Sequence, residues 1–235
     1  MVGRTQETGR VMGQAIGDSL PLAIGVAISP IPIIAIILML LSKRSGTNSA
    51  SFLVGWVLGI AIVLSVVVAV AGTATLNTST GPETGVSWIK IALGALLLLV
   101  GVRDWRKRPK GDEEPTLPKW LTAIEGITPV KSGGLGLLLS AVNPKNLLLL
   151  VAAGVAIAQE APSTGDKAVA MIIFIVIAIS TVALPVILNA TVGSRAKDLL
   201  NSINTWLKVN NATVMAVLLL VIGFVLIGKG IGGFG

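Results

Sequence analysis

Four consecutive residues, Asn143, Pro144, Lys145 and Asn146, are the ones in this chain best suited to bind a ligand. They interrupt an apolar stretch that runs from residue 132 to residue 159. The uncharged segment on either side of Lys145 is too short to cross a bilayer, which takes about 20 residues, whereas the two segments together are long enough. An ammonium at the midplane costs about 2.5 to 3.5 kcal/mol on insertion scales, so it normally faces a cavity or a partner. We therefore predict a broken membrane span with a binding or permeation site at the break.

Pro144 explains why the span should break at this point. It has no amide hydrogen, so the carbonyl of Ser140 loses its helical partner. Asn143, Lys145 and Asn146 are expected to occupy the resulting gap. A simpler interpretation stays open, in which the helix is only kinked and Lys145 pairs with freed carbonyls or extends its stem to the membrane surface.

The groups available to such a site favour an anionic or zwitterionic ligand over a bare metal cation. No Asp or Glu lies inside a predicted span, whereas a lysine and several Asn, Ser and Thr residues do. Exposed amides at the start of a half-helix add partial positive charge. If transport is coupled to protons, Lys145 and Asp18 are the evident carriers.

Other kinds of chemistry lack the residues they need. The chain has no Cys and no His, so we expect no cofactor, no metal site and no redox chemistry. No nucleophile–base pair and no phosphate-binding loop appear in the sequence, and we expect no enzymatic activity.

Composition indicates a membrane protein. Hydrophobic residues make up 53% of the 235 residues and charged residues 12%, about half the charged fraction of a typical soluble domain. The net charge of +7 comes from basic residues in short segments beside apolar spans. Such a distribution sets orientation in a membrane, and we expect no nucleic-acid partner.

Six membrane spans are expected, and a second proline motif lies in the first of them. The spans cover about residues 20–41, 50–72, 88–102, 132–159, 168–194 and 209–228. In the first, Pro30 and Pro32 follow Ser29 and remove two amide donors, so this helix should be broken as well. In the second, Gly55 and Gly59 have the spacing of close helix packing, which we expect within one chain rather than at a dimer interface.

The fifth span carries a polar stripe in its second half. Its members are Ser180, Thr181, Pro185, Asn189 and Thr191. The proline is expected to kink the helix, and Asn189 is the member that we assign to ligand binding.

The distribution of basic residues predicts the topology. Twelve Lys and Arg residues lie in the segments after the first, third and fifth spans, and five lie on the opposite side. Basic loops stay in the cytoplasm, so both termini should lie outside. The segment 103–131 is then a cytoplasmic loop, and its second half suits a short helix on the membrane face. That helix could equally cover the inner mouth of a pathway.

The two proline motifs suggest an internal repeat. Residues 27–33 and 141–147 both place a polar residue and a proline after small or apolar residues, inside the first span of a three-span half. Because three is odd, the halves enter the membrane from opposite faces. The predicted fold is therefore an all-α polytopic membrane protein with two inverted three-helix repeats, residues 1–102 and 132–235.

With these motifs the chain resembles the LysE superfamily of exporters, and most closely its GAP family, the peptidoglycolipid addressing proteins. The resemblance spans essentially the whole chain. It implies a bacterial inner-membrane protein that moves cell-envelope glycolipids or lipid-linked precursors outward, often as a homodimer, with envelope-biosynthesis partners. The motif residues that it marks as substrate-binding are Ser29, Pro30, Pro32, Asn143, Pro144, Lys145 and Asn146. Amino-acid exporters typically carry Pro-Gly-Pro at the first motif, and the bulkier Ile31 argues against such a substrate here.

Three functional hypotheses follow. The first is a transporter for an anionic glycolipid or lipid-linked substrate, which predicts a groove open to the bilayer. The second is a small-solute exporter, which predicts a closed aqueous cavity. The third is an accessory subunit of an envelope-synthesis complex, for which Lys145→Ala should leave function intact.

Overall fold

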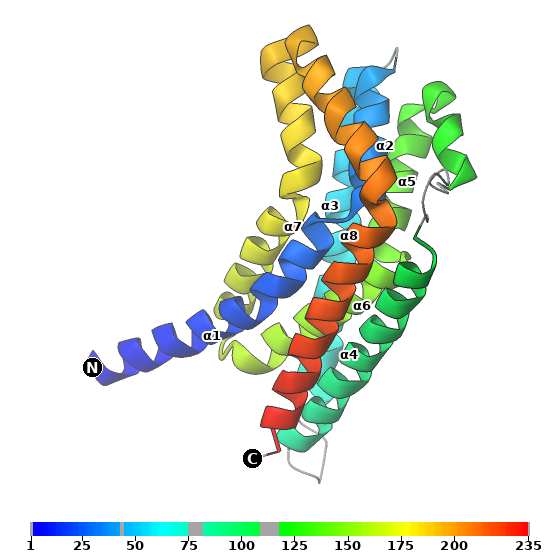
Figure 1. The fold of residues 1–235 in the computed structure, drawn as a ribbon. Coiled ribbons are helices and arrows are strands. Elements are labelled where there is room, and N and C mark those ends of the chain that lie inside the picture. The colour runs from blue at the N-terminus through cyan, green and yellow to red at the C-terminus, as the bar shows by residue number, and fades with distance from the viewer. Residues whose placement is uncertain (1, 43–44, 75–81, 109–117, 235) are drawn as a thin grey trace.

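The computed structural model describes residues 2–42, 45–74, 82–108 and 118–234, and within these residues the chain is helical, without strands (Figure 1). The elements in chain order are α1 (Val2–Ala27), α2 (Pro30–Leu41), α3 (Ser45–Ala74), α4 (Pro82–Arg106), the 3-10 helix η1 (Lys119–Gly126), α5 (Pro129–Ala141), α6 (Pro144–Glu160), α7 (Thr164–Val192), the 3-10 helix η2 (Gly193–Ala196) and α8 (Lys197–Gly232).

Four single helices and two bent helix pairs are long and apolar enough to cross a membrane. The four are α3, α4, α7 and α8. The pairs are α1 with α2, bent by 49°, and α5 with α6, bent by 60°. The described helices thus contain four spans, or up to six if each bent pair counts as one. The expectation of a polytopic membrane protein is confirmed.

Both predicted breaks are present, and proline is the local cause of each. Pro30 is the first residue of α2 and Pro144 the first of α6. Proline suits this position, because its fixed φ matches the helix and its missing amide hydrogen would have no partner there. Ser29 and Asn143 precede them with extended backbone. A continuous helix would need an amide hydrogen at each of these positions. Because proline has none, it begins a new helix instead.

Several helices extend further than the sequence analysis predicted. The first bent pair qualifies as a span from Met12, and the third span runs from Gly85 to Arg106. The predicted loop before residue 209 is wrong, because α8 already begins at Lys197. Apolar content marks only the part of a helix in hydrocarbon, whereas hydrogen bonding continues the helix into polar residues at the surface. Pro185, where we expected a kink, lies within the unbroken helix α7.

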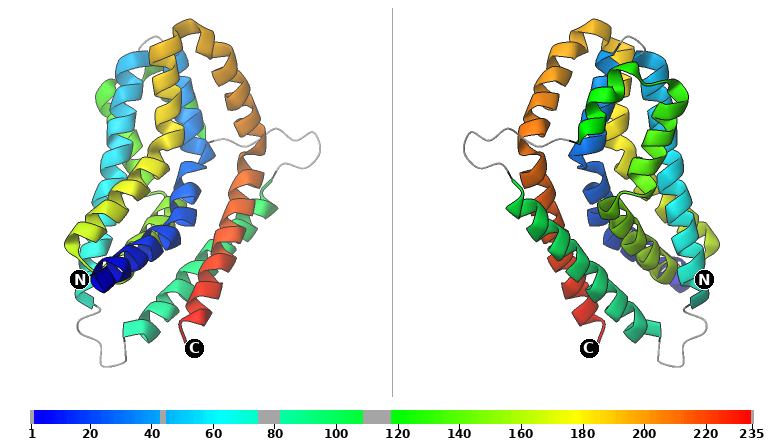
Figure 2. Two further views of the ribbon diagram at one scale, coloured as in Figure 1. Left: turned by 90° about the vertical axis from the view of Figure 1, so that its left-hand side faces the viewer. Right: turned by 90° about the vertical axis from the view of Figure 1, so that its right-hand side faces the viewer.

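The helices form an elongated bundle with the start of α1 and the end of α8 at the same end (Figure 1). The first turns of α1 project away from the bundle, while η1 and η2 lie toward the opposite end. Views from two opposite sides show α4 beside the C-terminal half of α8, along one side of the molecule (Figure 2).

Glycines allow the closest helix contacts. A Cβ on Gly55 would lie 1.9 Å from the carbonyl oxygen of Gly133, and one on Gly59 would lie 1.9 Å from Ser140 Oγ. These contacts join α3 to α5, so the predicted packing of this glycine pair within one chain is confirmed. In the same way, a Cβ on Gly94 of α4 would lie 2.8 Å from the carbonyl oxygen of Gly223 on α8.

Gly55→Ala should therefore destabilise the fold by about 1 to 3 kcal/mol, the usual cost of overpacking, despite alanine's higher helix propensity. Gly46→Ala is the matched control, because Gly46 is also in α3 and a Cβ there would meet nothing within 4 Å. Thermal unfolding of the detergent-solubilised protein measures both. Equal melting temperatures for the two variants would contradict the packing of α3 on α5.

Candidate functional site

Lys145 brings the two helix breaks together. Its side chain is 3% exposed, and its ammonium nitrogen Nζ lies 3.3 Å from the hydroxyl oxygen of Ser29, at the other break. The same nitrogen lies 3.4 Å from the sulfur of Met215 on α8. The hydrogen-bond partners of this ammonium are thus side chains of other helices, and not the freed carbonyls of its own break. The kink-only interpretation is wrong for this residue.

Side chains satisfy several backbone groups that the breaks set free. At the second break, Asn146 Nδ2 donates to the carbonyl of Leu139 at 3.0 Å, and the Lys145 amide donates to Asn143 Oδ1 at 3.1 Å. At the first break, the hydroxyl of Thr181 on α7 donates to the carbonyl of Ala27. We had expected the Ser140 carbonyl to be the group in need of a partner, whereas Asn146 binds the carbonyl one residue earlier. These bonds hold each break in a defined shape.

The positive charge of Lys145 is not neutralised by direct contact. Its two side-chain partners are a neutral hydroxyl and a thioether, which is a weak acceptor. In the part of the chain that the structure describes, no salt bridge reaches Lys145. Asp104 on α4 acts on it electrostatically from a greater distance. A buried ammonium with such weak partners is suited to accept an anionic group, because charge-assisted hydrogen bonds are the strong ones.

A mainly apolar groove runs up to this break from the surface. It has a volume of about 430 Å³ and is lined by Ile31, Pro118, Trp120, Leu138, Leu139, Val142, Asn143 and Pro144. Its side is open, since Leu138 is 54% exposed and Val142 62%. The groove therefore connects the two proline motifs with the surrounding hydrocarbon.

The 3-10 helix η1 packs beside this groove. Trp120 forms part of the lining, and Leu121 and Ile124 are buried. The helix also contacts α2. Of the two roles left open for this segment, the structure favours a cover over the mouth of the groove. Residues 109–117 of the predicted loop, which include Leu117 at the start of the expected helix, lie outside the described residues.

Some of the remaining predicted site residues lie at a helix break, and others do not. Pro30 and Pro32 are buried on α2 at the first break. Asn189 is half-buried on α7, and none of the hydrogen bonds found among the described residues joins its side chain to Lys145. The residues of the polar stripe of α7 do not all face the same surroundings. Ser180 and Thr191 are exposed, and their hydroxyls donate to carbonyls of their own helix. Of that stripe, Thr181 is the residue that the structure brings to a break.

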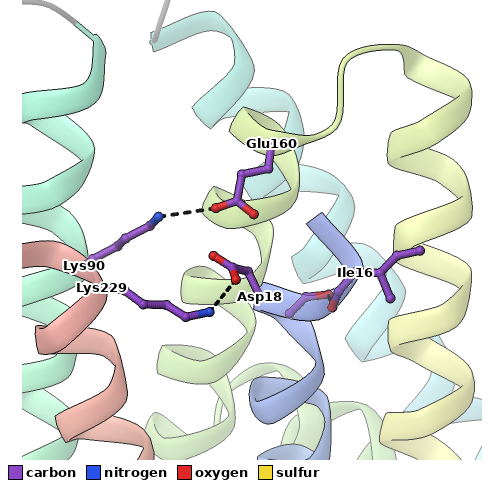
Figure 3. Close-up of polar contacts among 6 residues, drawn as sticks. Ile16, Asp18, Lys90, Glu160 and Lys229 are labelled. Carbon is purple, nitrogen blue, oxygen red and sulfur yellow. Dashed lines mark hydrogen bonds and ion pairs between the residues drawn. The ribbon is translucent and has the colours of Figure 1, made fainter. Parts of the chain in front are cut away.

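Sequence reasoning missed two ion pairs at the end of the bundle where the termini lie (Figure 3). Lys90 Nζ lies 3.4 Å from Glu160 Oε1, and Lys229 Nζ lies 2.6 Å from Asp18 Oδ1. The lysines come from α4 and α8 and the carboxylates from α6 and α1, so both pairs join the α4–α8 side to the broken helices. The available signal was the position of all four charges at span ends on the same predicted side.

None of the described side chains forms a group of three or more acidic residues that could hold a metal ion. The site is instead a single buried cation, flanked by neutral hydrogen-bonding groups and an apolar groove.

Comparison with protein families shows what the chain is similar to. The family model SfLAP, described as "Sap, sulfolipid-1-addressing protein", matches residues 20–232. No curated protein and no solved structure shows a significant match to the chain. The family match supports the expected resemblance to addressing proteins of the GAP kind, and the wider LysE superfamily placement stays a prediction.

Lys145→Met should fold as well as the wild type, with an equal or higher melting temperature. The methionine fills a similar volume, and replacing a weakly paired buried charge by an apolar group is often neutral or stabilising. Asn146→Leu is the contrasting variant, because it leaves the Leu139 carbonyl unpaired and should cost about 1 to 3 kcal/mol. Thermal unfolding compares them. If Lys145→Met were the less stable variant, Lys145 would stabilise the fold, and this result would contradict its assignment to a ligand-binding site.

The ion pair of Asp18 with Lys229 should give a coupling free energy of up to about 1 kcal/mol in a double-mutant cycle of Asp18→Asn and Lys229→Met. Both side chains are partly shielded, with 26% and 30% exposure. As a control, Asp18→Asn combined with Lys131→Met should be additive, because Lys131 is an exposed residue of α5. Additivity in both cycles would contradict a contact between α1 and α8.

Proposed function

We propose, from the premise that the chain belongs to the sulfolipid-1-addressing protein (SfLAP) family, that it moves an anionic or zwitterionic envelope glycolipid or lipid-linked precursor across its membrane. One observation carries the proposal. The Lys145 ammonium is buried where two broken helices meet, without a carboxylate partner among the described residues, and an open apolar groove reaches that point. A sulfolipid is itself an anionic lipid, so the family description agrees with this chemistry.

Each part of an amphiphilic substrate has a matching surface. The anionic head group binds Lys145, with the Ser29 hydroxyl 3.3 Å from the ammonium nitrogen as a second hydrogen-bonding group. The acyl chains lie in the groove, whose walls Leu138 and Val142 are exposed to lipid. The tails thus stay in hydrocarbon while the head group passes the bundle interior, which avoids the large cost of moving a charge through lipid alone.

The inverted repeat forms part of the proposal. It pairs α1, α2, α3 and α4 with α5, α6, α7 and α8, and two features of the packing support it. The contact of α3 with α5 has a counterpart in that of α7 with α1, and the contact of α4 with α8 maps onto itself. Helices broken near the midplane at a repeat interface are where transporters of this kind bind substrate.

Alternate opening and closing of the two ends of the helix bundle gives the transport of the lipid a direction. The ion pairs of Lys90 with Glu160 and of Lys229 with Asp18 close the end that carries the termini, so this conformation accepts substrate from the groove and the opposite end. Breaking them separates α4 and α8 from α1 and α6. We place the closed end on the outer face of a bacterial inner membrane, because the exposed Arg103 and Arg106 at the other end of α4 fit the cytoplasmic side.

The alternatives predict different surroundings for Lys145. A small-solute exporter needs a closed aqueous cavity at the break, whereas the groove there has apolar and exposed walls. An accessory subunit does not need a buried ammonium at a midplane break, which is costly to insert. The groove and Lys145 together favour the lipid substrate.

Native mass spectrometry of gently extracted protein tests the proposal. The wild type should retain an anionic amphiphile, and Lys145→Met should lower its occupancy about tenfold or more, the effect of losing one hydrogen bond to a charged group. Lys131→Met removes an exposed lysine from α5 and should change nothing. Equal lipid occupancy in both variants, or a bound water-soluble solute in place of lipid, would contradict the proposal.

A further inference from the structure

Two asparagines on α8 have buried amide oxygens that find no hydrogen-bond partner among the residues that the structure describes. These are Oδ1 of Asn204, whose side chain is 6% exposed, and Oδ1 of Asn211. Buried polar atoms are nearly always hydrogen-bonded in proteins. Neither residue belongs to the proline motifs, and nothing in the binding of an anion by Lys145 uses them.

Both asparagines lie on the face of α8 that leads to Lys145. Asn204, Asn211 and Met215 are separated by seven and four residues, which places them on one side of a helix. The sulfur of Met215 contacts the Lys145 ammonium. At 1.5 Å per residue, Asn211 lies about 6 Å and Asn204 about 16 Å along α8 from Met215, in the direction away from the ion pairs. The two oxygens therefore lie on the same face of α8 as Met215, toward the end of the bundle opposite the ion pairs.

The neighbouring residues described below offer no hydrogen-bond donor to these oxygens. Helix α2 packs against α8 and contains no side chain that could donate a hydrogen bond. The neighbouring buried residues of the same α8 face, Leu200 and Leu207, are apolar. A neutral amide oxygen is suited to a neutral donor such as a hydroxyl, whereas an ammonium group would need a carboxylate.

We propose that Asn204 and Asn211 form a subsite for the hydroxyl groups of a carbohydrate or other polyol head group, beside the anion site at Lys145. The inference rests on the proposed function and adds the chemical class of the head group to it. Asparagine both accepts and donates, so each residue binds neighbouring hydroxyls, and Lys145 fixes the charged group of the same molecule. The subsite selects hydroxylated anionic lipids over other anionic lipids of equal charge.

The test compares two lipids that carry the same phosphodiester charge, phosphatidylinositol with several hydroxyls and phosphatidylmethanol with none. Each is titrated into the full-length protein and its occupancy is measured by native mass spectrometry. The wild type should bind phosphatidylinositol about tenfold more tightly. Asn204→Leu with Asn211→Leu should remove this preference and leave phosphatidylmethanol binding unchanged. Asn204→Ala with Asn211→Ala is the second variant if the larger side chains disturb the packing.

Two controls separate the possible failures. Asn201→Leu changes an exposed asparagine of the same helix and should keep the preference. Lys145→Met should weaken both lipids equally. If Lys145→Met weakens both but the double asparagine variant keeps the preference, or the wild type shows none, the subsite is wrong and the proposed function stands. If neither lipid depends on Lys145, both proposals fail.

Discussion

The candidate site depends on one ammonium group, that of Lys145, which is buried between two interrupted helices. Pro30 and Pro144 cannot donate the amide hydrogen that a continuous helix needs, so each begins a second half-helix. The interruptions would be costly in hydrocarbon unless the freed backbone groups found partners. Asn146 and Thr181 supply two of them. Lys145 then lies in a polar environment inside an apolar bundle, yet without a carboxylate in contact.

This incomplete pairing distinguishes a binding site from a structural bond. A lysine kept for stability would be expected in an ion pair, as Lys90 and Lys229 are at the end of the bundle. Lys145 instead has a hydroxyl and a thioether, and an apolar groove lies beside it. The same chain thus uses paired lysines to close one end and an unpaired lysine in its interior. In the proposed function, an anionic amphiphile completes the arrangement, with its charge at Lys145 and its tails in the groove.

The sequence predicted those features that depend on a single residue or a short stretch. A proline cannot donate the hydrogen bond to the carbonyl four residues earlier in a helix. Both breaks could therefore be located from Pro30 and Pro144 alone. The membrane spans followed from apolar length, and the packing role of Gly55 and Gly59 from their spacing. The start of α8 was misplaced because hydropathy reports the environment of a helix and not its hydrogen bonds.

Features that depend on tertiary packing could not be predicted. Met215 lies 70 residues from Lys145 along the chain, and Lys90 lies 70 residues from Glu160. Each pair meets only once the helices are assembled. On α7, the residue in hydrogen-bond contact with a break is Thr181. The residue type of Asn189 suits a binding site, and its assignment to ligand binding stays a prediction.

A cryo-electron microscopy structure of the protein in nanodiscs with bacterial anionic lipids tests the central claim most directly. Helix interruptions at Ser29 and Asn143 are predicted, with head-group density in contact with Lys145 Nζ and acyl-chain density beside Leu138 and Val142. Continuous helices through Pro30 and Pro144, with Lys145 turned to bulk water or acyl chains and no head group near it, would contradict the account.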